Sequence, residues 1–477
     1  MAETRGVEHQ PQSEEKETRV IAACSLSDME RNAGVRKNGS IWTIIGCAFA
    51  NLSDGYQQNL ASSTNVVFNH LLTTKVYTAD TQTRISNSLL VGSVIGILVF
   101  GFTADKFSRK GGMLVTSGLV IIGSLLATVI FQVKGTNNML WFLTIARGMA
   151  GVGVGGEYPT SAAAALEGSN EHFDNQRGPI QVLISTLMAT SGAPICTTVY
   201  LLSLIASNNN LKTAYHAMYS ISIILPLIVI LLRLKMQDAL LFSKSNFQKR
   251  HIPWSLVLKY WPRILGTSLA FFLYDFVNFP NSIMSSVIIN SLVPGKNVRT
   301  VAIWQLILAL FPIPGVLLGA WLVNRIGRKW TGILGFSGYV ILGFLIGGLY
   351  TTLTSHMAAF VVLYGLFACL GHMGPGATIG LISAESFPTA VRGMGYGIAA
   401  GFGKAGAAVG TQVFTPVQVE VGKAATFYLA GGVGVFGVIV YWALPEGRSV
   451  DLRGMDEVFE GYMRERGYRE TMEIEGR

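Results

Sequence analysis

The strongest constraint on this chain is a series of long apolar stretches joined by polar connections. Twelve of them, each of roughly 20 residues, can be read between residues 41 and 443, and about 20 apolar residues are what an α-helix needs to cross a bilayer core. Only 13% of the residues are charged, against about a quarter in a soluble domain. The expected spans are 41–65, 87–104, 113–133, 139–165, 178–205, 214–234, 263–290, 301–323, 330–350, 356–383, 393–416 and 424–443. The sequence therefore predicts an all-α membrane protein with twelve transmembrane helices.

The basic residues predict how these helices are oriented. The net charge is +9, and much of the excess lies after the second, sixth and eighth expected spans. The residues are Lys106, Arg109 and Lys110, then Arg233, Lys235, Lys244, Lys249, Arg250 and Lys259, and finally Arg325, Arg328 and Lys329. Connections rich in Lys and Arg stay in the cytoplasm, so both tails are expected there too. This distribution explains the positive charge without a nucleic-acid partner.

The two halves of the chain resemble each other. Gly101–Lys110 after the second expected span matches Gly319–Lys329 after the eighth, and Glu167 and Glu385, 218 positions apart, are each followed by an Arg-Gly pair. Two six-helix pseudo-repeats with substrate at their interface are the design of an alternating-access carrier. The expected divisions are a tail at 1–40, a bundle at 41–234, a cytoplasmic linker at 235–262, a second bundle at 263–443 and a tail at 444–477.

The repeated loop also predicts a gate at the cytoplasmic mouth. Asp105 ends a helix beside basic side chains with which it can pair, and Gly101 permits close helix approach. For any one basic residue of this loop, fixing the orientation of the chain is an equally good explanation. The residues expected to form the gating ion pairs are Asp105, Arg109, Glu167, Arg328 and Glu385.

These motifs resemble those of the major facilitator superfamily. The resemblance rests on the Gly-x-x-x-Asp-x-x-x-Arg-Lys loop at 101–110, on its second copy, and on Arg147-Gly148 with the glycines that follow in the fourth expected span. It covers the whole chain except the tails. It implies the major facilitator fold, with two six-helix bundles around a central substrate site.

Four ionisable residues, Asp54, Glu157, Asp275 and Lys404, fall inside otherwise apolar spans. An ionisable side chain at the membrane centre costs about 2.5–3.5 kcal/mol to insert, so it marks a functional site by default. Asp54 lies in the polar segment 51–59, which must line a cavity or pack inward, and a water-filled cavity is the favoured explanation. Asp275 occupies the equivalent helix of the other half. Buried carboxylates can exchange protons near neutral pH, which predicts proton coupling.

Lys404 stands among small residues with no acidic residue near it on its own helix. Its counter-charge must come from another helix or from a substrate. A permanent ion pair with Asp54 or Asp275 is one explanation. We predict instead that Lys404 binds an anionic substrate, because a lysine is a mobile point charge well suited to phosphate.

The motifs around these residues resemble those of the phosphate:proton symporters and of their fungal relatives, the glycerophosphodiester permeases. The resemblance implies that Asp54, Glu157 and Asp275 carry protons and that Tyr158 and Lys404 contact the phosphate. Asp275 and Asn278 are also expected at the substrate, although Asn278 could equally hold helices together. The matching motifs are Gly156–Pro159, Asp275, Pro388–Gly393 and Gly403–Ala407.

Several positions depart from the inorganic-phosphate pattern of that family. Those carriers usually have Asp in place of Glu157, tyrosine in place of Phe279 and Asn in place of Gly376. Because Gly376 removes a side chain and a donor, the pocket is expected to be roomier and less polar there. A phosphate ester with a bulky organic substituent would fit that change.

The sequence thus predicts a monomeric, proton-coupled symporter of phosphate-containing organic anions in the plasma membrane. Glycerophosphoinositol and glycerophosphocholine are the expected substrates, with protons and the lipid bilayer as the other partners. An inorganic phosphate:proton symporter, a carboxylate or small-metabolite transporter and a transporter-like nutrient sensor are the alternatives. The sequence contains no Walker-type phosphate loop, metal cluster or nucleophile–base pair, so neither enzyme activity nor a cofactor is expected.

Overall fold

The computed structural model describes residues 12–103, 109–172, 176–234, 258–446 and 452–465, and the regular elements in these ranges are all helices. The first half contains α1 (Gln12–Leu71), α2 (Ala79–Thr103), α3 (Arg109–Thr128), α4 (Thr136–His172), α5 (Arg177–Val182), α6 (Met188–Ala206) and α7 (Leu211–Leu234). The second half contains α10 (Trp261–Leu292), α11 (Val298–Leu310), α12 (Pro312–Arg325), α13 (Arg328–Gly348), α14 (Tyr350–Thr354), α15 (Met357–Gly371), α16 (Ala377–Glu385), α17 (Arg392–Pro416) and α18 (Lys423–Ala443). A final helix, α19 (Leu452–Glu465), follows. The all-α prediction is confirmed.

Three expected spans are less apolar than the rest. Within the described residues, nine helices or merged helix pairs are long and apolar enough to cross a membrane. The expected spans outside that set are α1, α10 and α17, which carry Asp54, Asp275 and Lys404 respectively. Helices with such residues have to turn them toward the bundle interior, and all three side chains are indeed buried.

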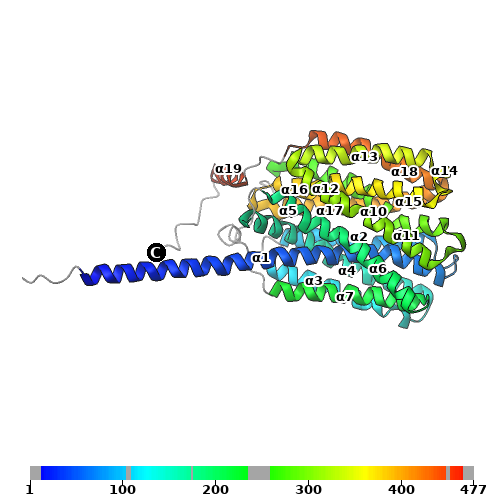
Figure 1. Ribbon diagram of the computed structural model, residues 1–477, viewed down its shortest axis with the longest axis horizontal. Coiled ribbons are helices and arrows are strands. Elements are labelled where there is room, and N and C mark those ends of the chain that lie inside the picture. The colour runs from blue at the N-terminus through cyan, green and yellow to red at the C-terminus, as the bar shows by residue number, and fades with distance from the viewer. Residues whose placement is uncertain (1–11, 104–108, 173–175, 235–257, 447–451, 466–477) are drawn as a thin grey trace, which may run out of the picture.

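The first helix is longer than the sequence predicts. The expected tail at 1–40 ends where the first span was placed, but α1 begins at Gln12 and continues without a break to Leu71. Figure 1 shows its first part projecting beyond the bundle. The extension contains no proline and is rich in Glu, Lys, Arg and Ala, which favour helix, so residue 41 does not mark the start of the helix.

The C-terminal tail expected at 444–477 contains the helix α19. Phe459 and Met463 of α19 pack against Tyr260 and Phe387 of the second half. Asp456 accepts hydrogen bonds from the backbone N–H and the hydroxyl of Thr389, at 2.6 and 2.7 Å. The helix is strongly amphipathic and buries its apolar face on the connection between α16 and α17.

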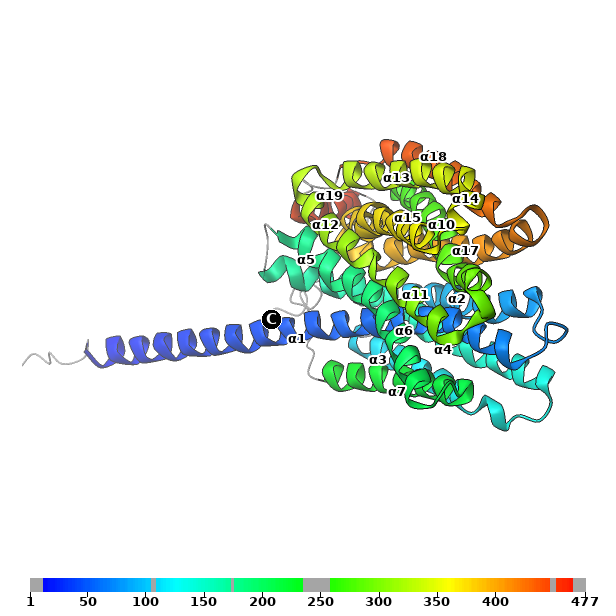
Figure 2. The same cartoon turned by 45° about the vertical axis from the view of Figure 1, so that its right-hand side comes forward.

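The two halves lie side by side with their helices roughly along one axis. Figures 1 and 2 both show α3 and α7 on one outer side and α13 and α18 on the other, with α10 and α17 between them. The end of the bundle from which α1 projects, where α19 also lies, is called the tail end. The opposite end, where α1 finishes at Leu71 and α10 at Leu292, is called the loop end.

Glycines allow α1 and α6 to cross in close contact next to Asp54. A Cβ atom added to Gly55 would lie 1.8 Å from the carbonyl oxygen of Ala189, and one added to Gly192 would lie 2.2 Å from the backbone nitrogen of Tyr56. Such contacts are too short for any side chain. The two backbones therefore pack directly on each other, as small residues permit in membrane proteins.

Replacing Gly55 by alanine should destabilise the protein because the new methyl group has no space. Overpacking a tight site costs about 1–3 kcal/mol, so the thermal unfolding midpoint of the purified protein should fall. Gly118→Ala in α3 is the matched control, since a Cβ atom there meets nothing within 4 Å. Equal midpoints for the two variants would contradict the proposed close contact.

Candidate functional site

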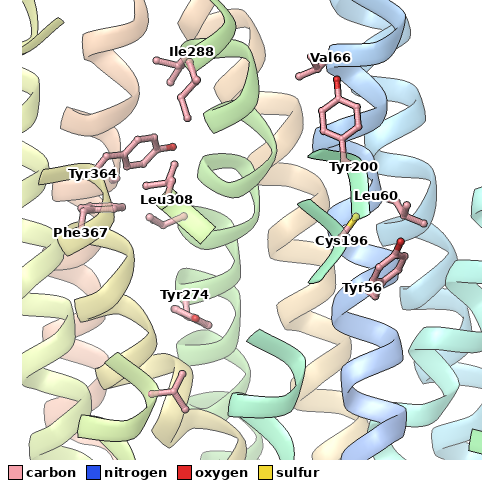
Figure 3. Close-up of a cluster of buried hydrophobic side chains, with 14 of the residues drawn as sticks. Tyr56, Leu60, Val66, Cys196, Tyr200, Tyr274, Ile288, Leu308, Tyr364 and Phe367 are labelled. Carbon is pink, nitrogen blue, oxygen red and sulfur yellow. The ribbon is translucent and has the colours of Figure 1, made fainter. Parts of the chain in front are cut away.

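A cavity of about 250 Å³ lies between the two halves of the bundle. Its walls come from α1, α4 and α6 on one side and from α10, α11, α15 and α17 on the other. Figure 3 shows buried side chains of the two halves, with Tyr56 and Leu60 on α1 of the first half and Tyr274, Tyr364 and Phe367 on the second, of which the last three also line the cavity. This volume is somewhat below the range typical of drug-sized ligands, which suits a small metabolite.

An ion pair stands in the wall of this cavity. The ammonium of Lys404 in α17 donates to the Oδ2 atom of Asp275 in α10, at 3.2 Å, and both side chains are 6% exposed. Both residues line the cavity. Of the two explanations considered for Lys404, the structure therefore shows the ion pair with Asp275, which was not the favoured one. The pair forms because α10 and α17, both in the second half, pack side by side. Lys404 is nevertheless placed where it can reach a bound molecule.

Aromatic rings surround the Lys404 ammonium. Its nitrogen lies 4.0 Å from the ring centroid of Phe279 and 4.8 Å from that of Tyr158. Tyr158 belongs to α4 of the other half, and its hydroxyl accepts a hydrogen bond of 2.9 Å from Gln58 of α1. Lys404 is thus the point at which the two halves meet at the cavity, and cation–π contact adds to its stabilisation.

Two π-helical segments, one from each half, meet across the cavity. They are Leu183–Leu187 between α5 and α6 and His372–Gly376 between α15 and α16. The hydroxyl of Thr186 donates to the carbonyl oxygen of Gly376 at 3.1 Å. Such single-turn π segments within helices are frequent at functional sites.

The expectation that Gly376 enlarges the pocket is wrong. A Cβ atom at Gly376 would lie 2.6 Å from the hydroxyl oxygen of Tyr274, so a tyrosine ring already occupies the space that an asparagine side chain would need. Asn278, by contrast, lines the cavity as expected.

Asp54 packs inward and does not line the cavity, so the outcome favoured for it is wrong, and Glu157 is packed inside the bundle as well. Both are buried, at 3% and 2% exposure, and neither is among the described residues that line the cavity. The face of α1 that lines the cavity carries Asn51, Gly55 and Gln58. Asp54 lies on another face of the helix and points away from the cavity. The carboxylate of Asp54 interacts electrostatically with Glu157, Arg233 and Lys404, so it lies between the charges of the two halves.

Glu157 is held inside the first half by Arg233, a residue expected in the connection after the sixth span and not at a buried site. The Nη1 atom of Arg233 lies 2.8 Å from Glu157 Oε1, and it also donates to the Ser117 hydroxyl and to the Met113 carbonyl oxygen. The Ser117 hydroxyl donates to the same carboxylate at 3.0 Å. This ion pair connects α4 and α7.

The assignment of Arg233 to the cytoplasmic connection is wrong. Its side chain is 0% exposed, because α7 continues to Leu234 and turns this residue toward α3 and α4. The signal was present in the sequence, where Arg233 stands between Leu232 and Leu234 at the end of an apolar run. A basic residue flanked by apolar ones is a candidate for a buried partner.

A second group of charges closes the tail end. Glu385 of α16 accepts from Arg328 of α13 at 3.1 Å and from Arg177 of α5 at 3.2 Å. Arg177 belongs to the first half and the other two residues to the second, so the carboxylate connects the halves. Glu446 accepts in addition from the backbone N–H of Arg328 at 2.8 Å.

The other expected gating residues cannot be placed in this group. Asp105 lies outside the described residues, as do the side chains of Arg109 and Glu167. Arg328 and Glu385 are the two that the structure brings together.

Contacts at the loop end also cross between the halves. Arg299 of α11 donates to the Asn209 side chain at 2.6 Å, and His70 of α1 contacts the carbonyl oxygen of Lys296 at 3.1 Å. Thr83 of α2 donates to the hydroxyl of Thr415 in α17 at 2.9 Å. The cavity therefore has cross-half contacts on both sides, and opening either side requires one set to break.

Replacing Glu385 by glutamine should weaken the closure of the tail end. The change keeps the shape but removes the negative charge that pairs with Arg328 and Arg177 across the two halves, so the tail end should open more often. The measurement is the alkylation rate of a cysteine introduced at Ser185, which lines the cavity, and at least a several-fold faster reaction is expected. Glu420→Gln, at an exposed loop-end position, is the control that should leave the rate unchanged.

The chain matches the model of the sugar (and other) transporter family over residues 40–246 and 235–459. It is 58% identical over 448 residues to the MFS-type transporter lnaF of Aspergillus flavus, covering 93% of this chain and 91% of that protein. It is 39% identical over 436 residues to glycerophosphoinositol transporter 1 of Saccharomyces cerevisiae, covering 90% of this chain and 83% of that protein.

Solved structures with a similar fold include the proton:xylose symporter XylE of E. coli, a protein of the major facilitator superfamily. The TM-score is 0.71, and the match covers 89% of this chain and all of that chain (100%). The sequences are 17% identical, so this likeness concerns the fold alone.

Proposed function

We propose that this chain, which belongs to the sugar (and other) transporter family of the major facilitator superfamily, carries phosphate-containing organic anions together with protons. Its membership confirms the fold expected from the sequence and makes it a multi-pass membrane transporter. Glycerophosphodiesters such as glycerophosphoinositol or glycerophosphocholine are the proposed substrates. The name of the yeast relative, a glycerophosphoinositol transporter, supports this choice.

The observation that carries the proposal is the Lys404–Asp275 pair in the wall of the cavity. Within the described lining, Lys404 supplies the one ammonium and Asp275 the one carboxylate. An ammonium in low-dielectric surroundings attracts an anion strongly, and Tyr158 lies beside it. A phosphodiester entering the cavity can therefore take the place of the Asp275 carboxylate at Lys404.

The pair also supports coupling to protons. When Asp275 takes up a proton, its attraction for Lys404 falls, and the ammonium becomes available to the anion. When the anion leaves, Asp275 can lose its proton and pair with Lys404 again. In the empty site the Asp275 carboxylate balances the charge of Lys404, and in the loaded site the bound anion does so while Asp275 is protonated. One monoanion therefore moves together with one proton in this step.

Asp54 and Glu157 extend the proposed proton path into the first half. Asp54 interacts electrostatically with Lys404 on one side and with Glu157 and Arg233 on the other. It has no ion-pair partner among the described residues, whereas Glu157 is paired with Arg233. We therefore assign the mobile proton of this half to Asp54, with Glu157 acting on it through space.

The gating residues complete the cycle. The group around Glu385 at the tail end and the contacts of Arg299 and Thr83 at the loop end would break in turn, which exposes the cavity to one side at a time. The proposed setting is the plasma membrane, with both termini in the cytoplasm and the chain acting as a monomer.

Uptake by cells that express the chain tests the function. Labelled glycerophosphoinositol, glycerophosphocholine and inorganic phosphate are supplied at pH 5 and pH 7.5, with and without a protonophore. We expect uptake of the diesters that is faster at the lower pH and is lost when the proton gradient collapses. Uptake of phosphate alone, or uptake indifferent to the gradient, would refute the proposal.

A further inference from the structure

A second hollow, here called the outer groove, lies near the loop end where the two halves meet. Its volume is about 640 Å³, and its walls come from α2 and α4 of the first half and from α17 and the π-helical segment Val417–Val421 of the second. It shares no described lining residue with the cavity that holds Lys404. Val91 and Ile95 in its wall are 49% and 50% exposed, and α2 is apolar enough to cross a membrane. The outer groove therefore faces lipid.

Arg84 of α2 lines this groove as a cation without a counter-charge among the described residues. Its guanidinium carbon lies 3.8 Å from the ring centroid of Trp141 in α4. Apart from this stacking, the side chain is half-buried and makes no hydrogen bond or ion pair with the part of the chain that the structure describes. A guanidinium carries five N–H donors in a planar fork that matches phosphate. Arg84 is thus held in place with its donors available to a phosphate group.

The groove below Arg84 has the length of one lipid leaflet. Ile95 lies 11 residues after Arg84 in α2, which is about 16 Å at 1.5 Å of rise per residue. A bilayer core is about 30 Å thick, so the acyl chains of one leaflet fill about 15 Å. Glycines form the floor here, and a Cβ atom added to Gly92 would lie 2.1 Å from the carbonyl oxygen of Gly148. The absence of side chains at these two positions leaves room for an acyl chain.

Two carboxylates at the rim determine which head group fits. Asp80 of α2 and Glu420 of the π-helical segment both line the groove, and both are exposed. Together with Arg84 they give the site one positive and two negative charges, so a purely anionic head group would meet net repulsion. A zwitterionic head group carries its phosphate next to the glycerol and its ammonium farther out. That order matches the groove, because Arg84 lies four residues, about one helical turn, deeper along α2 than Asp80.

Contacts between the two halves run along the groove. The hydroxyl of Thr83 donates to that of Thr415 at 2.9 Å, and the Asn87 side chain donates to the carbonyl oxygen of Ala408 at 3.1 Å. Thr83, Asn87 and Thr415 all line the groove. A lipid seated there therefore touches both halves at once, which a lipid packed on one outer helix does not.

We infer that the outer groove binds one zwitterionic phospholipid, such as phosphatidylcholine, from the leaflet at the loop end. Its phosphate lies on Arg84, its ammonium lies toward Asp80 and Glu420, and one acyl chain follows Val91 and Ile95. This lipid is a bound component of the wall and not the transported molecule. The inference does not depend on the proposed substrate, because the groove is separate from the cavity of Lys404.

Lipid binding by the purified full-length chain tests the site. The chain in detergent is titrated with phosphatidylcholine, phosphatidylglycerol and diacylglycerol that carry the same acyl chains, and bound lipid is counted by native mass spectrometry. One phosphatidylcholine should bind with a Kd at least about 10-fold below the Kd of the other two. Arg84→Gln should raise the Kd for phosphatidylcholine about 10-fold or more, because a hydrogen bond to a charged group is lost. Thr144→Phe fills the groove and should weaken binding as much with every charge kept.

Arg325→Gln is the matched control. Arg325 also lies over a tryptophan ring, that of Trp321 at 5.3 Å, but it is outside the groove lining. This change should leave the Kd for phosphatidylcholine unchanged, and the thermal unfolding midpoint of each variant shows that it is folded. Equal Kd values for phosphatidylcholine and phosphatidylglycerol, or a Kd for phosphatidylcholine that Arg84→Gln leaves unchanged, would overturn the inference. Either result would leave the proposed transport of phosphate esters standing.

Discussion

Replacement of Lys404 by alanine should lower uptake of the substrate about 100-fold or more. The variant leaves the Asp275 carboxylate buried without its counter-charge and removes the cation that holds the anion. Removing one partner of a buried, hydrogen-bonded charge pair weakens binding by about 2–5 kcal/mol or more, and each 1.4 kcal/mol corresponds to a factor of ten. The measurement is the initial rate of labelled glycerophosphoinositol uptake, corrected for the amount of protein in the membrane.

Asp275→Asn separates the two roles of this pair. The amide resembles the protonated carboxyl group, so Lys404 stays available and the substrate should still bind. Accumulation against a concentration gradient should be lost, because no proton can be released at this position.

Lys212→Ala, at an exposed position of the loop end, is the control for loss of a lysine in the Lys404→Ala experiment. Uptake retained in Lys404→Ala would exclude Lys404 as the anion site.

Replacement of Arg233 by methionine should prevent most of the chain from folding stably. The Glu157 carboxylate, 3% exposed, would remain in the bundle without its counter-charge, at a cost of about 3–5 kcal/mol. That is a large part of the stability of an ordinary protein. The fraction that elutes as a folded monodisperse species in detergent, and its thermal unfolding midpoint, measure the loss.

The double variant Glu157→Gln/Arg233→Met should restore most of the folded protein. Replacing both members of a buried pair by neutral groups of similar volume is often nearly neutral in free energy. Its uptake should respond differently to pH, because Asp54 loses two neighbouring charges. Arg325→Met, at an exposed position at the end of α12, serves as a control for loss of an arginine. A double variant as unstable as Arg233→Met alone would contradict the ion-pair explanation.

Much of the site could be predicted from residue type and position. An ionisable side chain in an apolar span has to be buried in protein, and Asp54, Glu157, Asp275 and Lys404 are all buried. The repeat likewise predicted that Glu385 and Arg328 would matter together, and they form an ion pair. These inferences succeed because the membrane makes exposure of such groups costly.

The partners of these residues were harder to predict. Lys404 pairs with Asp275 of α10, Glu157 with Arg233 of α7, and the room at Gly376 is taken by Tyr274. Each partner lies far away in the chain and belongs to another helix. Nothing in the local sequence states which faces of two helices meet.

The sequence by itself determined that this chain is an all-α membrane protein of two related halves with charges buried at its centre, because span length and the cost of charge in lipid are properties of short segments. Only the tertiary structure decided that Asp54 turns away from the cavity, that Arg233 is a buried partner, and that Lys404 pairs with Asp275 in the cavity wall. Helix rotation and packing set these outcomes, and they depend on contacts between segments that the linear order of residues leaves open.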